Sequence, residues 1–158
     1  MNQEERNSLI NEIENLPVKL IEAVKNLSEE QLDTPYGEGK WTIRQVVHHL
    51  ADSHMHAYLR TKWAFTETKP TIKTYEQNDW AVLEDAKNYS VVSSISILIG
   101  LHARWSNWLK SLSENDFLKS AIHPENGEMN LDRFLKIYSN HGKNHLNQIL
   151  SLKEKNNW

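Results

Sequence analysis

Four stretches of this chain place apolar side chains at every third or fourth position, and this periodicity restricts the fold more than any other feature. Such spacing puts the apolar side chains on one face of an α-helix, which must be buried against other helices. The stretches cover about residues 5–27, 42–65, 91–113 and 131–152. No convincing strand alternation accompanies them. The sequence therefore predicts an all-α fold, a four-helix bundle.

Local signals predict where these helices begin and how they are connected. Thr42 followed by Gln45 fits a capping box at the start of the second helix, and Asn130 is an N-cap for the fourth. Pro17 predicts a kink in the first helix. Residues 28–41 are rich in turn residues and predict a loop.

The segment between the second and third helices is unusually long for a simple bundle. Residues 67–90 contain Pro70 and little periodicity, apart from a short helix expected around Asp79 to Asp85. We expect a long, partly structured crossover here. Such a connection indicates that the helices do not simply alternate up and down.

Length and charge restrict the class of protein. A chain of 158 residues predicts a single domain, residues 1–158, that can bury its own core. The net charge of −3, without a concentrated basic patch, argues against nucleic acid as a partner. No apolar run is long enough to span a membrane, and the first residues are polar and acidic, so we expect a cytoplasmic protein.

His141 and His145 are the most informative pair for chemistry. They fall on the core stripe of the fourth helix at a spacing of four, which places them one turn apart on one face. Two such imidazoles can bind one metal ion together, although hydrogen bonding or partial exposure would also account for them. Because the chain has no cysteine, any metal must be held by His, Asp or Glu.

The second helix offers a third imidazole, because four histidines crowd into nine of its residues: His48, His49, His54 and His56. The apolar stripe favours His54, whereas His49 lies toward the edge of the stripe. Periodicity alone therefore leaves the third ligand open. His102, on the stripe of the third helix, is expected to be a buried structural histidine or one that supports a ligand. Asp52 could orient His48 from one turn away, although a solvated pair is the simpler account.

Three histidines without a fourth protein ligand would leave one coordination position open, as in catalytic metal sites. Zinc is the first choice for such nitrogens, with nickel or another divalent first-row metal as alternatives. No E-x-x-H, G-x-S-x-G, P-loop or dinucleotide motif is present, which argues against di-iron bundles, serine hydrolases and nucleotide enzymes. The tryptophans, Trp41 among them, are expected to anchor the core and interfaces.

Several segments resemble the YfiT branch of the DinB-like superfamily through most of the chain: Gln31 to Tyr36, Trp41 to Met55, Leu101 to Trp105, and His123-Pro124. Members of that family are four-helix bundles, commonly dimeric, with zinc or nickel on three histidines. Some are described as metal-dependent hydrolases and some act as bacillithiol S-transferases. The chain departs from the family in a short N-terminal segment and in Asn140, Asn144 and Gln148 near the last helix's histidines.

The resemblance implies that His49, His141 and His145 are the metal ligands, and it alone selects His49 over His54. It also implies a homodimer and a metal-dependent enzyme that joins a small-molecule thiol, such as bacillithiol, to an electrophilic substrate. A hydrolase that activates water at the same site is one alternative, with Asp52 as a candidate base. A non-catalytic metal-binding or stress-response bundle is another.

Overall fold

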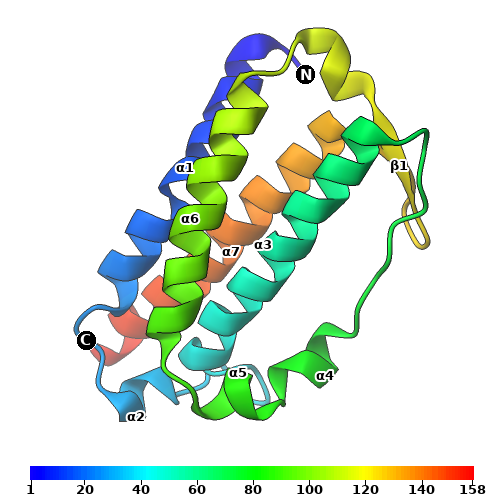
Figure 1. Ribbon diagram of the computed structural model, residues 1–158. Helices are drawn as coiled ribbons and strands as arrows, with labels where there is room; N and C mark the ends of the chain where they lie inside the picture. Colours follow the sequence, from blue (N-terminus) through cyan, green and yellow to red (C-terminus); the bar gives the residue numbers. More distant parts are fainter.

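The computed structural model describes residues 1–158 and contains a bundle of four long helices (Figure 1). These are α1 (Gln3–Val24), α3 (Ile43–Thr66), α6 (Val91–Lys110) and α7 (Leu131–Asn156). Each corresponds to one of the periodic stretches of the sequence, so the predicted four-helix bundle is confirmed. α1 ends at Val24, one turn earlier than expected, and it continues through Pro17.

The topology is set by the long connection between α3 and α6. α3 and α6 run parallel to each other along the bundle, while α1 and α7 run in the opposite direction (Figure 1). α1 and α3 both pack against α6 and α7, which places α1 diagonally opposite α3. The crossover, residues 67–90, was predicted. It contains two short helices, α4 (Gln77–Ala81) and α5 (Glu84–Asn88), where one was expected.

Side-chain caps fix the starts of two helices that carry histidines. At α3, the amide of Gln45 donates to the Thr42 hydroxyl at 3.1 Å, and the amide of Thr42 donates to the Gln45 side chain at 2.9 Å. At α7, the Asn130 side chain accepts from the amide of Arg133 at 2.9 Å. Both predicted N-caps are therefore confirmed, and each satisfies an amide that the helix leaves without a partner.

The core consists of two apolar clusters, and two fully buried histidines lie between them along the bundle. On α3 the first cluster ends at Ala51 and the second begins at Ala57, and on α6 the change falls between Leu98 and Trp105. His54 and His102 occupy these two intervals and are fully buried. The bundle therefore contains a polar layer near its middle, in which hydrogen bonds replace apolar contacts.

The structure also contains short elements that the sequence analysis did not predict. A two-stranded antiparallel sheet, β1 (Ser120–His123) and β2 (Gly127–Asn130), follows a 3₁₀ helix, η1 (Glu114–Leu118), and pairs Ala121 with Met129. Strands of four residues are too short to show alternation. A single helical turn, α2 (Glu29–Leu32), lies within the predicted loop. The hairpin is joined to the crossover by hydrogen bonds from Ile122 to Pro70 and from Ile72 to Ile122.

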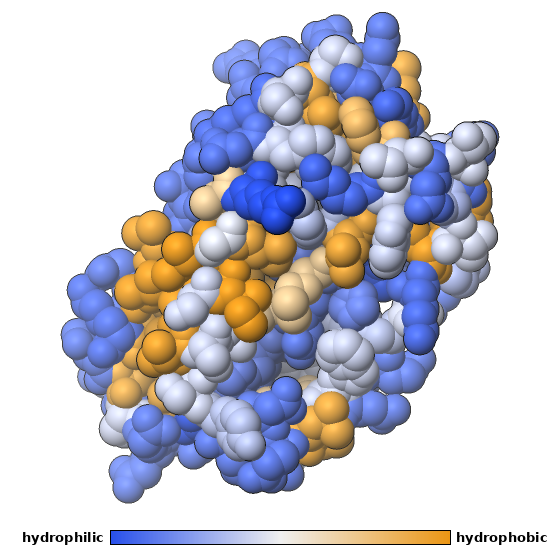
Figure 2. Space-filling model, viewed as in Figure 1, coloured by the Kyte–Doolittle hydropathy of each residue, from blue (hydrophilic) through white to orange (hydrophobic).

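The surface carries an apolar patch over the first half of α6 and the neighbouring part of α1 (Figure 2). Its exposed side chains include Val92 (64% exposed) and Ile99 (47%) on α6, and Val18 (62%) on α1. Val92 and Ile99 are seven residues apart and so share one face of their helix. None of the helices combines the length and apolarity needed to cross a membrane.

Candidate metal centre

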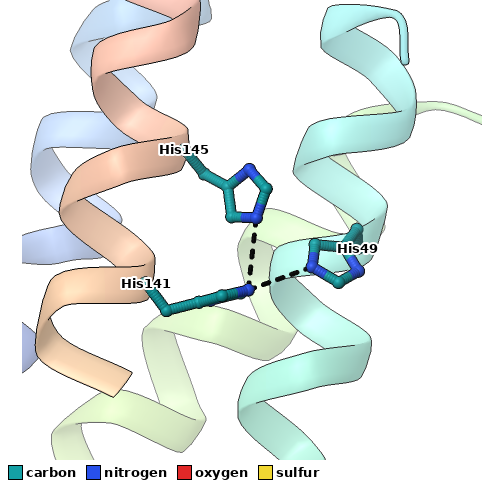
Figure 3. A group of neighbouring side chains, drawn as sticks. All are labelled: His49, His141 and His145. Atoms are coloured by element: carbon teal, nitrogen blue, oxygen red, sulfur yellow. Dashed lines mark hydrogen bonds between the residues drawn. The ribbon is translucent and has the colours of Figure 1, made fainter. Parts of the chain in front are cut away.

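Three histidines converge at the contact between α3 and α7 (Figure 3). His49 comes from α3, and His141 and His145 come from α7. The Nε2 atom of His141 lies 3.1 Å from Nε2 of His49 and 3.2 Å from Nε2 of His145. One nitrogen from each ring falls within 4.8 Å of the other two, so the three rings could hold one ion. The structure thus brings together the three residues that the family resemblance selected.

A chain of hydrogen bonds determines which nitrogen of His141 is free. His102 Nδ1 lies 2.5 Å from the carbonyl oxygen of Ile13, so this nitrogen must donate. Burial lowers the pKa of His102 to about 4, which keeps the ring neutral and leaves its Nε2 as an acceptor. His54 Nδ1 donates to that atom at 2.9 Å. His54 Nε2 then accepts from His141 Nδ1 at 3.2 Å, so His141 Nε2 carries a lone pair.

A neighbour on α7 fixes His145 so that its Nε2 is free, as in His141. Its Nδ1 donates to the side-chain oxygen of Gln148 at 2.8 Å, which leaves a lone pair on Nε2. Two lone pairs, on His141 and His145, therefore face each other across 3.2 Å. This arrangement is repulsive unless a cation or a hydrogen-bond donor lies between the two nitrogens.

The protonation of the three rings favours a metal ion over a proton as that cation. Burial, with a smaller contribution from the neighbouring His145, lowers the pKa of His141 to about 2 and that of His49 to about 3. The pKa of His145 is also lowered by burial, against the opposing effect of Gln148. Two nitrogens bound tetrahedrally to one zinc ion lie about 3.4 Å apart. The neutral donor set and its spacing therefore fit a divalent first-row metal.

Two cavities border this site and share the residues Gln77, Asn78 and His141. The first, which we call the Trp41 cavity, has a volume of about 350 Å³. It is lined by Tyr36, Gly39, Lys40, Trp41, Gln77, Asn78, His141 and His145. The second, the Arg60 cavity, has a volume of about 360 Å³. It is lined by Ser53, Arg60, Thr74, Tyr75, Glu76, Gln77, Asn78, His123, Glu125 and His141.

The walls of these cavities come from segments whose role the sequence did not indicate. Trp41 was expected to anchor the core, but its ring packs against His49 at 4.6 Å and His145 at 6.3 Å between ring centres. Gln77 and Asn78 come from the start of α4 in the crossover. The only available signal was that a long, partly structured loop often carries function.

The remaining histidines of α3 have structural partners. His48 lies 2.8 Å from the Ser94 hydroxyl and 3.1 Å from the carbonyl of Tyr89, so both its nitrogens are engaged. Asp52 therefore does not orient His48, which leaves the simpler of the two accounts considered for this pair. His56 stacks on Tyr75 with ring centres 4.5 Å apart, which holds the crossover against α3.

His102 and Asp52 were the other two candidates for a role near the metal site. His102 bonds to His54, which in turn bonds to His141, so His102 supports a candidate ligand through His54. Asp52 lines neither cavity. Its pKa is raised to about 6, first by burial and then by the nearby Asp85.

Comparison with known proteins gives consistent matches over nearly the whole chain. The sequence profile of the DinB superfamily matches residues 12–149. A Bacillus mycoides protein, provisionally named a metal-dependent hydrolase, is 50% identical over 149 residues, which cover 94% of this chain and 86% of that protein. An Oceanobacillus iheyensis protein with the same provisional name is 47% identical over 152 residues, covering 96% and 88%.

Solved structures agree with these matches. YfiT from Bacillus subtilis, described as a probable metal-dependent hydrolase with an unusual four-helix bundle topology, superposes with a TM-score of 0.97 at 38% identity. The superposition covers 100% of this chain and 91% of YfiT. TT2238, described as a four-helix bundle protein, gives a TM-score of 0.63 at 16% identity over 92% of this chain and 98% of its own, which supports the fold alone.

Proposed function

The chain belongs to the DinB superfamily, and we propose that it is a metal-dependent thiol S-transferase with zinc held by His49, His141 and His145. The relatives that are provisionally named as metal-dependent hydrolases support a metal-dependent enzyme at the general level. The observation that carries the proposal is the pair of lone pairs on His141 and His145, 3.2 Å apart and beside a third imidazole. Nickel or another divalent first-row ion could occupy the same nitrogens.

The chemistry expected of the site divides between the ion and the chain. A bound divalent ion would act as a Lewis acid that lowers the pKa of a thiol or water at its open position. The chain's own residues hold the imidazoles in place: Gln148 orients His145, and His54 orients His141. Trp41 covers one side of the imidazoles and limits the access of water. The Trp41 cavity is large enough to admit part of a small molecule.

The absence of a carboxylate from the Trp41 cavity favours a thiol over water as the nucleophile. Hydrolysis needs a general base, whereas a thiol needs only a lowered pKa to become a thiolate. Asp52, the candidate base from the sequence, lines neither cavity, and Glu76 and Glu125 are exposed at the rim of the Arg60 cavity. Hydrolysis at the same site remains the second candidate function, supported by the names of the relatives.

A cobalt-substituted protein tests the proposal. We expect intense d–d bands in the wild type, and a new thiolate-to-cobalt charge-transfer band when bacillithiol or another small thiol is added. His49→Ala, His141→Ala and His145→Ala should each lose the d–d bands. Turnover of an electrophilic substrate should require the thiol.

Other outcomes of this experiment would identify the alternatives. Cobalt binding without a response to thiol, together with thiol-independent turnover, would favour a hydrolase. Cobalt binding with no turnover, and unfolding on removal of the ion, would favour a non-catalytic bundle tied together by its metal. A wild type that does not bind cobalt would contradict the metal site.

We also propose that two copies of the chain pair through the apolar patch of Val18, Val92 and Ile99. Exposed apolar patches on soluble proteins commonly mark interfaces, and equal patches meet in a twofold homodimer. Ile99→Glu is expected to weaken self-association by about tenfold or more, because dimer formation would then bury an unpaired carboxylate. Sedimentation equilibrium measures the effect. Ile137→Glu on α7, at a side chain 40% exposed, is the matched control and should leave the dimer intact. A wild type that sediments as a monomer would rule out the pairing.

A further inference from the structure

Arg60 differs from the other buried arginines in having no carboxylate partner. Arg6 pairs with Asp132 at 2.9 Å, and Arg44 pairs with Asp33 and Glu29. Arg60 is also buried, at 7% exposed, but it makes no ion pair. A buried charge without a counter-ion is strongly unfavourable. The position of Arg60 is therefore explained best if the counter-ion comes from outside the chain.

The hydrogen bonds of Arg60 hold it in place and leave donors free. One terminal nitrogen donates to the Tyr138 hydroxyl at 2.8 Å, and the other donates to the Lys73 carbonyl at 2.6 Å. These bonds use two of the five N–H donors of a guanidinium. The Nε atom is buried and has no partner. The guanidinium is thus fixed on neutral oxygens at the wall of the Arg60 cavity.

Two more donors line the same cavity. The Tyr75 hydroxyl is buried and makes no hydrogen bond of normal geometry, although the Ser53 hydroxyl lies near enough to lower its pKa slightly. Burial raises the pKa of Tyr75 to about 12, so the hydroxyl keeps its proton and can donate. His123 Nδ1 accepts from the amides of Glu125 and Asn126 at 3.1 and 3.3 Å. The neutral ring therefore carries its proton on Nε2, which is a donor as well.

We propose that the Arg60 cavity binds an oxyanion group of the substrate, with Arg60, Tyr75 and His123 as the donors. This inference rests on the proposed function, because His141 lines the same cavity and would place the oxyanion beside the reacting centre. The planar guanidinium matches the two oxygens of a carboxylate or a phosphate. The exposed side chains of Glu76 and Glu125 at the rim would repel further negative charge, which favours one oxyanion group in this cavity.

Titration of metal-free protein with small anions tests this inference separately from the metal site. Malonate and inorganic phosphate are the probes, malonamide is the neutral control, and the side-chain Nε–H signal of Arg60 in NMR spectra is the readout. We expect at least one anion to shift this signal to saturation. Arg60→Met should weaken its binding about tenfold or more, the loss expected for a hydrogen-bonded charge. The tighter of the two anions identifies carboxylate or phosphate as the group.

Three further variants separate recognition from folding and from general charge. Lys73→Met removes an exposed positive charge two residues before Tyr75. It should change the anion affinity by less than about twofold, the range for a solvated charge. Tyr75→Phe removes a hydroxyl that makes no hydrogen bond of normal geometry, so this variant should fold normally and still weaken anion binding. Arg60→Lys keeps the charge but loses the planar, two-pronged guanidinium. Its anion affinity should lie between those of the wild type and Arg60→Met. Equal anion affinity in wild type, Arg60→Met and Tyr75→Phe would overturn the inference, even if cobalt binds at the three histidines.

Discussion

Replacing His54 by leucine is expected to weaken divalent-metal binding by about 10- to 100-fold, the usual effect of losing a partner behind a ligand. His54 is not one of the three converging histidines, but it accepts a hydrogen bond from His141 Nδ1 at 3.2 Å. Without that acceptor, the proton of His141 is free to occupy Nε2, which is the nitrogen that faces His49 and His145. The affinity can be measured by competition with a chromophoric chelator.

His48→Leu is the matched control for this prediction. His48 is a buried histidine of the same helix, and its bonds to Ser94 and Tyr89 do not lead to His141. Both variants lose buried hydrogen bonds and should lose stability, but only His54→Leu should lose metal affinity. NMR of the metal-free wild type should show the proton of His141 on Nδ1. Equal metal affinity in the two variants would show that the chain from Ile13 to His141 has no influence on the ligand.

The choice between His49 and His54 shows how far periodicity can predict this site. The apolar stripe of α3 points at the centre of the bundle, and His54 on that stripe is fully buried beside His102. A metal that binds a substrate must instead lie where the bundle opens to a cavity. His49, at the edge of the stripe, meets His141 there. Periodicity identifies the most buried residues, whereas a reactive site needs partial access, so the family resemblance was needed to select His49.

The long helices and their caps were predictable because each depends on local sequence. Stripes such as Ile43 to Leu50, and caps such as Thr42 and Asn130, act within a few residues of their own positions. The cavity walls depend on contacts between distant segments instead. Trp41 meets His145 only when α7 packs against α3, and Gln77 lines a cavity beside His141 only when the crossover folds back over α3. Short elements such as α4 and the β1–β2 hairpin lack enough residues to show a period, so their role could not be inferred from pattern.

Acid is expected to destabilise the metal-free protein steeply between pH 6.5 and 5. All eight histidines have pKa values below the ordinary 6.5, with burial as the largest cause in each. Below pH 6.5 the unfolded chain binds protons that the folded chain excludes, so folding stability is present above this pH and is lost as the pH falls. Each buried histidine contributes about 1.4 kcal/mol per pH unit.

The four histidines with the most strongly lowered pKa values dominate this effect: His49, His54, His102 and His141. Together they should reduce the free energy of unfolding by about 5 kcal/mol between pH 6 and pH 5, a large share of the about 5–15 kcal/mol typical of a domain. Asp52 acts in the opposite direction, because its pKa is raised to about 6 and the folded state binds its proton first. One such group cannot offset four.

Urea unfolding of EDTA-treated protein at a series of pH values measures the slope of the free energy of unfolding against pH. His48→Gln should lower this slope by at most about one proton, because an amide can still bond to Ser94 and Tyr89 but does not titrate. A slope no steeper than that of a single group would mean that the buried histidines accept protons in the folded state. In that case the hydrogen-bonded chain behind His141 would not hold its nitrogens in the neutral form that metal binding requires.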